Sequence, residues 1–143
     1  MVACRRAILR GLMSNENVEL VRSFYRPASL SRFIDLLDEE VEFDFSAYPV
    51  PGPAVLRGKE AAIDWCRSYW GTWDEYILEP TAIIDASEDQ VVVVQHERAR
   101  GKGSGVQLER HWAVIFTIRT GRVVRFEAFR TSEEAVAAAG LRG

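Results

Sequence analysis

The chain has 143 residues, 48% of them hydrophobic, and a formal net charge of −3. A chain of this length that folds as one domain buries roughly two thirds of the surface of the unfolded chain, so we expect one compact domain rather than two. Its basic residues form no long block, which excludes the electrostatic footprint of a nucleic-acid-binding protein.

Residues 1–13 carry three arginines around short apolar stretches. These stretches are too short for the core of a signal peptide or for a membrane span, so we expect no membrane partner. We expect this segment to be a disordered tail, or to precede a natural start at Met13, with residues 14–143 forming the domain.

The two cysteines lie in unlike contexts. Cys4 is in the N-terminal segment, whereas Cys66 falls on the apolar face of a predicted helix. A disulfide between them is therefore not expected, and a reducing, cytoplasmic location fits better.

Two short helices are predicted at the start of the domain, because apolar residues recur there at helical spacing. Both have candidate N-cap residues, and the first ends at a proline, which cannot continue a helix. The expected boundary residues are Ser14 or Asn15 and Pro27 for the first helix, and Ser29 or Ser31 and Asp38 for the second.

Residues 41–45 alternate apolar and acidic side chains, as expected for a short strand. Successive side chains of a strand point to opposite faces, so Glu42 and Asp44 share one face and the apolar residues share the other. Residues 46–58 then contain three prolines and two glycines. This composition disfavours a helix or a central strand and predicts a loop at the mouth of a pocket.

A third helix is predicted from Lys59 to about Trp73, because an aromatic stripe recurs at helical spacing. The segment from Tyr76 to Asp85 follows as a strand. It contains Pro80, which lacks a backbone N–H, so we expect an edge position or a bulge there.

Three further strands are predicted between Gln90 and Arg130, joined by two glycine-bearing turns. Thr131 and Glu134 then have the spacing of a capping box and begin a short terminal helix. Helices followed by a run of antiparallel strands indicate an α+β fold, in which the helices pack over one face of a bent sheet and close a pocket.

Two registers are open at the last turn. A type I turn with a bulge at Gly121 places Trp112, Val114 and Phe116 on one face with Val124, Phe126 and Ala128, and buries no unpaired charge. A tight turn at Thr120-Gly121 instead places Arg125, Glu127 and Phe129 on that face. The first register is favoured because it separates apolar from polar residues better.

Six motifs carry a family resemblance: Glu16-Asn17-Val18, Leu36-Leu37-Asp38, Leu56-Arg57-Gly58-Lys59-Glu60, Arg98 to Gly105, Phe116 to Arg125, and Ala138-Ala139-Gly140-Leu141. With the element order, they resemble the nuclear transport factor 2-like superfamily and its SnoaL-like group, related to polyketide cyclases and steroid isomerases. The resemblance implies a cone-shaped, cystatin-like antiparallel sheet around a hydrophobic cavity, covered by three N-terminal helices with a short C-terminal helix. It also implies a homodimer.

In the enzymes that this chain resembles, a carboxylate removes a proton or activates water, and a tyrosine, an acid or an arginine stabilises the oxygen that gains charge. The resemblance implies no metal or organic cofactor. Asp44 lies in the region where steroid isomerases place their proton-abstracting aspartate, although it also fits a solvent-facing position beside Glu42. Many relatives carry an acid near position 128, where this chain has Ala128; Glu127 takes that role only in the alternative register.

His96 and Arg110 complete the candidate catalytic set, as a proton donor and an oxygen-binding cation. An ordinary sheet position explains His96 equally well. Two histidines without a matching carboxylate pattern predict no metal site. The candidate ligand-binding residues are Tyr48, Trp65, Tyr69, Trp112, Phe116, Phe126 and Arg130.

Three functions remain open at this point. The first is a cofactor-independent isomerase, cyclase or epoxide hydrolase acting on a small apolar molecule that bears a carbonyl or epoxide. The second is a non-catalytic binder of a hydrophobic metabolite. The third is a dimeric protein-interaction module, which a filled cavity would favour.

Overall fold

The computed structural model describes residues 16–26, 28–48 and 52–142. The predicted N-caps Ser14 and Asn15, the helix end at Pro27 and the tail of residues 1–13 lie outside the described residues. Residues 16–24 are helical. The following elements are α2 (Leu30–Leu36), β1 (Leu37–Asp44), β2 (Val55–Arg57), α3 (Lys59–Gly71), β3 (Trp73–Asp85), β4 (Gln90–Gly101), β5 (Gln107–Arg119), β6 (Arg122–Phe129) and α4 (Ser132–Arg142).

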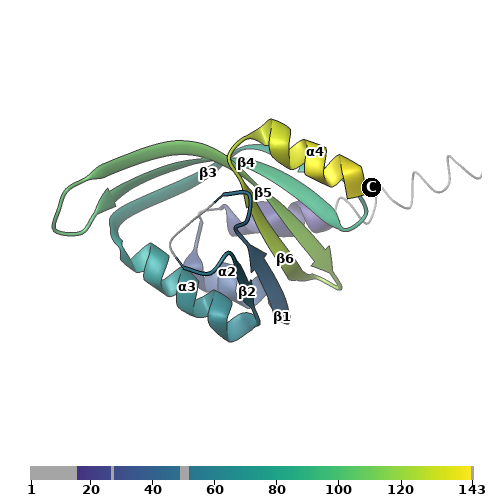
Figure 1. Ribbon diagram of the computed structural model, residues 1–143, viewed down its shortest axis with the longest axis horizontal. Coiled ribbons are helices and arrows are strands. Elements are labelled where there is room, and N and C mark those ends of the chain that lie inside the picture. Colours follow the sequence, from purple (N-terminus) through teal and green to yellow (C-terminus); the bar gives the residue numbers. More distant parts are fainter. Residues whose placement is uncertain (1–15, 27, 49–51, 143) are drawn as a thin grey trace, which may run out of the picture.

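The six strands form one curved sheet in the order β2-β1-β6-β5-β4-β3, which confirms the predicted α+β class. The sheet curls over α2 and α3, while α4 lies against the opposite face (Figure 1). One pair departs from the predicted antiparallel arrangement, because β1 runs parallel to β6. No helix in the described ranges is long and apolar enough to cross a membrane.

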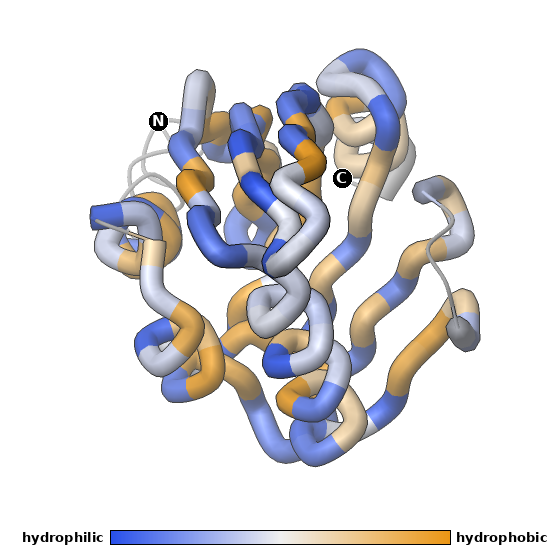
Figure 2. The backbone as a smooth tube through the Cα atoms, turned by 90° about the vertical axis from the view of Figure 1, so that its left-hand side faces the viewer, coloured by the Kyte–Doolittle hydropathy of each residue, from blue (hydrophilic) through white to orange (hydrophobic). Residues whose placement is uncertain are grey.

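Two hydrophobic cores lie on the two faces of the sheet. The larger lies between the concave face and the N-terminal helices, and its aromatic centre comprises Phe24, Phe33, Phe43, Phe116 and Phe126. The smaller lies between the convex face and α4, and contains Ile115, Phe129 and Ala135. Figure 2 shows hydrophilic and hydrophobic residues alternating along the strands. Successive side chains of a strand point to opposite faces of the sheet.

The turn between β5 and β6 combines features of both predicted registers. Thr120 and Gly121 form a tight two-residue turn with φ of 51° and 75°, so the predicted type I turn is wrong. A register shift follows at once, between Thr117 and Ile118 of β5. It restores the favoured facing, with Phe116 opposite Phe126 and Val114 opposite Ala128. Val123, rather than the predicted Val124, enters the larger core.

Other boundaries differ by a few residues from prediction. Ser29 is the N-cap of α2 as expected, and its side chain accepts a hydrogen bond from the backbone N–H of Arg32. Pro80 lies in the edge strand β3 beside a register shift, also as expected. Strand β2 was missed within the predicted loop; it is three residues long and pairs with β1 at the other edge of the sheet.

Candidate functional site

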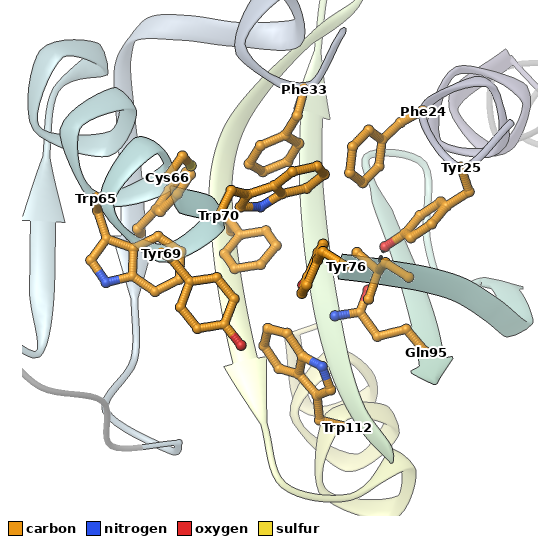
Figure 3. A pocket seen from close by; sticks show the side chains of 13 residues that line it. Phe24, Tyr25, Phe33, Trp65, Cys66, Tyr69, Trp70, Tyr76, Gln95 and Trp112 are labelled. Carbon is orange, nitrogen blue, oxygen red and sulfur yellow. Dashed lines mark hydrogen bonds between the residues drawn. The ribbon is translucent and has the colours of Figure 1, made fainter. Parts of the chain in front are cut away.

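A narrow cavity of about 30 Å³ lies between the concave face of the sheet and the helices. Its walls are mainly aromatic (Figure 3). This volume holds about one water molecule, so a larger ligand must displace wall side chains. The lining residues are Phe24, Tyr25, Phe33, Phe43, Trp65, Cys66, Tyr69, Trp70, Tyr76, Leu78, Gln95, Trp112 and Phe126.

A buried ion pair stands beside this cavity. Glu97 of β4 continues the concave-facing alternation of that strand, and Arg110 of β5 is directly opposite it. The side chain of Glu97 is 0% exposed and that of Arg110 is 25% exposed. Arg110 Nε donates to Glu97 Oε1 across 2.5 Å. A carboxylate in this setting needs such a partner, because an unpaired buried charge is strongly unfavourable.

Three tyrosine hydroxyls surround the pair. Those of Tyr69 and Tyr76 donate to Glu97 Oε2, at 2.8 Å and 2.5 Å. The two terminal nitrogens of Arg110 donate to the hydroxyl oxygens of Tyr48 and Tyr69. Among the described residues, Tyr69 and Tyr76 line the cavity and Glu97 does not, so these two hydroxyls connect the carboxylate to the cavity.

Burial and the negative charge of Glu97 together raise the pKa of both Tyr69 and Tyr76. Burial alone would lower the pKa of Arg110, but Glu97 raises it on balance. The tyrosines are therefore protonated and the arginine charged at neutral pH. Burial also raises the pKa of the Cys66 thiol to about 12, which makes it a poor nucleophile.

A second polar group lies farther along the cavity wall. Gln95 and Trp112 are cross-strand neighbours on β4 and β5, and Figure 3 shows their side chains next to each other. The hydroxyl of Tyr25 donates to Gln95 Oε1 across 2.6 Å. Trp112 Nε1 is buried and has no hydrogen-bond partner among the described residues.

Most of the residues predicted to bind a ligand do come together. Trp65, Tyr69, Trp112 and Phe126 line the cavity. Arg110 and Tyr48 are hydrogen-bonded to each other next to it. Two predicted positions are set apart: Phe116 lies in the core with its ring 5.4 Å from that of Phe126, and Arg130 is exposed after the end of β6.

The structure places Asp44 on the convex face, on the other side of the sheet from the cavity. Its neighbours in the strand, Phe43 and Phe45, point into the larger core, so the alternation turns Asp44 outward. Arg125 donates to its carboxylate across 3.0 Å. Glu127 also lies on this face, with an oxygen 3.4 Å from Arg125 Nε. The sheet therefore separates both acids from the cavity, which corrects the prediction of Asp44 as the base.

His96 likewise lies on the convex face. Its ring stacks on that of His111 with 4.4 Å between centroids, and its Nε2 is 2.9 Å from Glu109 Oε1. Because it is one residue from Glu97 along β4, it points away from the cavity. The predicted role of His96 as a proton donor to the ligand is therefore not supported by its position. Within the described ranges, no three metal-ligating side chains converge on a common point.

Glu97, Tyr76 and Gln95 were not predicted as site residues from the sequence. A signal for two of them was present, since Gln95 and Glu97 have the same parity as the buried Val91 and Val93. Polar residues that continue an apolar face are candidates for a buried polar site.

We predict that Asp44→Asn lowers stability only modestly. Partial burial favours the neutral acid, but hydrogen bonds from Ser46 and the charge of Arg125 hold the pKa of Asp44 below its usual value. The stabilisation is therefore present above the unfolded-state pKa of about 3.9 and is lost as the pH falls below it. Urea unfolding should show a loss of about 0.5–1 kcal/mol at pH 7 that shrinks as the pH falls below about 3.9. A loss that grows toward low pH would contradict this account.

A SnoaL-like domain family model matches residues 19–126 of the chain. Among proteins with curated annotation, none matches it. An NTF2-like protein from Anabaena variabilis is 16% identical in sequence, with a TM-score of 0.64; the match covers 84% of this chain and 87% of that one.

Two solved enzymes share the fold at similar distance. One is SalBIII, an epoxide hydrolase/cyclase-like enzyme with a role in pyran ring formation in the polyether salinomycin. It is 15% identical in sequence, with a TM-score of 0.67, and the match covers 85% of this chain and 95% of SalBIII. An LEH-like epoxide hydrolase of M. tuberculosis is 14% identical with a TM-score of 0.62, covering 90% and 92%. At these identities the likeness shows the fold alone.

Proposed function

This chain belongs to the SnoaL-like family, and from that premise we propose that it is a cofactor-independent enzyme of general acid/base chemistry. Its substrate is a small, mainly apolar molecule that carries a carbonyl or an epoxide oxygen. The observation that carries the proposal is a fully buried carboxylate, Glu97, joined to an aromatic-lined cavity by two tyrosine hydroxyls.

Glu97 is the proton acceptor, and Tyr76 connects it to the substrate. The hydrogen of the Tyr76 hydroxyl already points to Glu97, so its oxygen presents only lone pairs toward a ligand. A substrate hydroxyl or a water molecule passes its proton to the Tyr76 oxygen, while the Tyr76 hydrogen moves to Glu97. The electron pair stays on the oxygen of the substrate or water, which forms a bond to the epoxide or carbonyl carbon. The ring C–O bond or the C=O π bond breaks at the same time and leaves its electron pair on the epoxide or carbonyl oxygen, which then takes up the proton that Glu97 releases.

Arg110 orients the Glu97 carboxylate for that transfer, because its guanidinium donates directly to one carboxylate oxygen. The apolar walls exclude bulk water and strengthen these electrostatic interactions. Buried ion pairs contribute little net stability compared with apolar residues of similar size, so a role in chemistry explains this pair better than a role in folding.

A second candidate is a non-catalytic binder of a hydrophobic metabolite. One observation favours it: none of the described residues that line the cavity is a carboxylate. In this case the same hydrogen bonds would hold an oxygen-bearing ligand without turnover.

The proposal includes a homodimer, one domain over residues 14–143 and a cytoplasmic location. Ile77 and Ile84, exposed apolar side chains of the edge strand β3, support a contact between subunits. Sedimentation equilibrium checks the dimer.

We predict that Tyr76→Phe lowers turnover by about 10²–10⁴-fold, because it removes the proton relay and keeps the ring. Two probes cover attack on the two carbons: incorporation of ¹⁸O from water into the diol formed from cyclohexene oxide, and exchange of ¹⁸O from water into the carbonyl of cyclohexanone. Mass spectrometry reads both. Asp44→Asn is the matched control, since it alters a carboxylate on the opposite face of the sheet and should retain the rate.

Thermal unfolding with the same probes separates the two candidates. Label incorporation that depends on Tyr76 supports the enzyme. Stabilisation of the protein by either probe, with no label above the uncatalysed rate, would reject the enzyme and leave the binder.

A further inference from the structure

A buried N–H group of the cavity wall has no hydrogen-bond partner among the described residues. Trp112 is 6% exposed and lines the cavity. Its indole Nε1 is one of three buried side-chain nitrogens without a hydrogen bond in the described part of the chain, and of these residues only Trp112 lines the cavity. Such donors are rare in folded proteins, and where one faces a cavity it points to a ligand or a bound water.

The tyrosine hydroxyls of the cavity wall already donate hydrogen bonds within the protein. The hydrogens of Tyr69 and Tyr76 go to Glu97, and that of Tyr25 goes to Gln95 Oε1. An acceptor oxygen that enters the cavity therefore finds these three hydrogens in use. The indole N–H of Trp112 can donate a hydrogen bond to this oxygen, since an indole nitrogen is a donor only.

The surroundings of Trp112 favour an acceptor that carries negative charge. The guanidinium carbon of Arg110 lies 5.3 Å from the centre of the indole ring, which fixes the ring and brings a positive charge close. Gln95 lies directly across from Trp112 on β4. Figure 3 shows its amide nitrogen turned away from Tyr25, toward Tyr76 and Trp112.

We infer that Trp112 Nε1 donates a hydrogen bond to the substrate oxygen that gains negative charge, which makes Trp112 a specificity-determining residue. The ligand class is a small apolar molecule with a carbonyl, ether or epoxide oxygen on the side that faces β5. This inference rests on the proposed function for its reaction step, since Tyr76 takes the proton and Trp112 binds the oxygen that becomes charged. The binding of a neutral acceptor oxygen is independent of turnover.

An isosteric pair of probes isolates the oxygen. Cyclohexanone and methylenecyclohexane have the same ring and differ in C=O against C=CH₂. We expect the wild-type protein to favour the ketone, and Trp112→Phe to reduce the ratio of the two affinities by roughly 3- to 10-fold, the range for one neutral hydrogen bond. Trp70→Phe is the matched control, because it also removes an indole from the wall and should weaken both probes together, leaving the ratio unchanged.

A spectroscopic readout identifies the donor directly. In a ¹H–¹⁵N spectrum, the indole resonance that disappears in Trp112→Phe belongs to Trp112. It should move downfield on addition of cyclohexanone and stay in place on addition of methylenecyclohexane. If the chemical shift of this resonance does not change on addition of the ketone, as expected when Trp112 bonds only a buried water, the inference is overturned. Failure of both probes to bind also overturns it.

The Glu97→Gln variant distinguishes failure of the inference from failure of the proposed function. If this variant and the wild-type protein both show the ketone-dependent shift and neither turns over a substrate, the proposed function fails and the inference stands. If turnover depends on Glu97 while the ketone preference survives in Trp112→Phe, the inference fails and the proposed function stands.

Discussion

Replacing Glu97 by Gln is expected to slow turnover by about 10²–10⁴-fold and to destabilise the fold by about 3 kcal/mol. The two effects have separate causes. An amide keeps the shape of the side chain but cannot accept a proton from Tyr76, so the relay has no end point. It also leaves the charge of Arg110 without its counter-ion in a site where the replaced side chain is fully buried. Label incorporation measures the first effect and urea unfolding the second.

A double-mutant cycle with Arg110→Met tests the cause of the lost stability. If the loss in Glu97→Gln reflects an uncompensated guanidinium, removing that guanidinium as well should recover much of it. Glu109→Gln provides the control, because it removes a carboxylate from β5 that is exposed on the convex face. Additive losses for Glu97 and Arg110 would show that the two charges do not depend on each other, and the ion pair would then lose its place in the mechanism.

Burial alone made much of the fold predictable from sequence. Phe43 and Phe45 alternate with acids, and Phe116 and Val114 alternate along β5, so one face of each strand had to enter a core. The same alternation had already placed Asp44 beside Glu42, on the outer face where the structure has it. The family resemblance suggested the opposite, because an aligned position transfers a role without the direction of its side chain.

The Glu97–Arg110 pair could not be predicted from the sequence, for a different reason. Whether these residues face each other depends on the register across the loop of residues 102–106, which contains two of the chain's glycines, both with positive φ. A slip of one residue there would turn Arg110 outward. The position of Tyr76 depends in turn on the register shift of β3 between Trp73 and Glu75. Such irregularities are set by tertiary packing, which short-range patterns do not encode.

Phe43→Ala is expected to destabilise the protein by about 3–5 kcal/mol, the usual cost of removing a buried phenylalanine ring. Phe43 is 0% exposed and lines the cavity. Its ring centroid lies 4.9 Å from that of Phe126 and 6.0 Å from that of Phe33. Removing the ring therefore takes contacts from both neighbours at once and merges the vacated space with the existing cavity of about 30 Å³. Urea unfolding measures the loss.

Benzene should reverse part of that loss, because an apolar void of ring size stays dry and takes up a ring-shaped ligand. At ten times its dissociation constant, a ligand that binds only the folded state stabilises it by about 1.4 kcal/mol, which thermal unfolding resolves. Phe129→Ala removes the same ring from the smaller core beneath α4, away from the cavity. If benzene stabilises both variants equally, the space beneath the concave face has no special capacity for a ligand. If benzene stabilises Phe43→Ala alone, the aromatic side chains of the wall limit the size of the ligand that the cavity can hold.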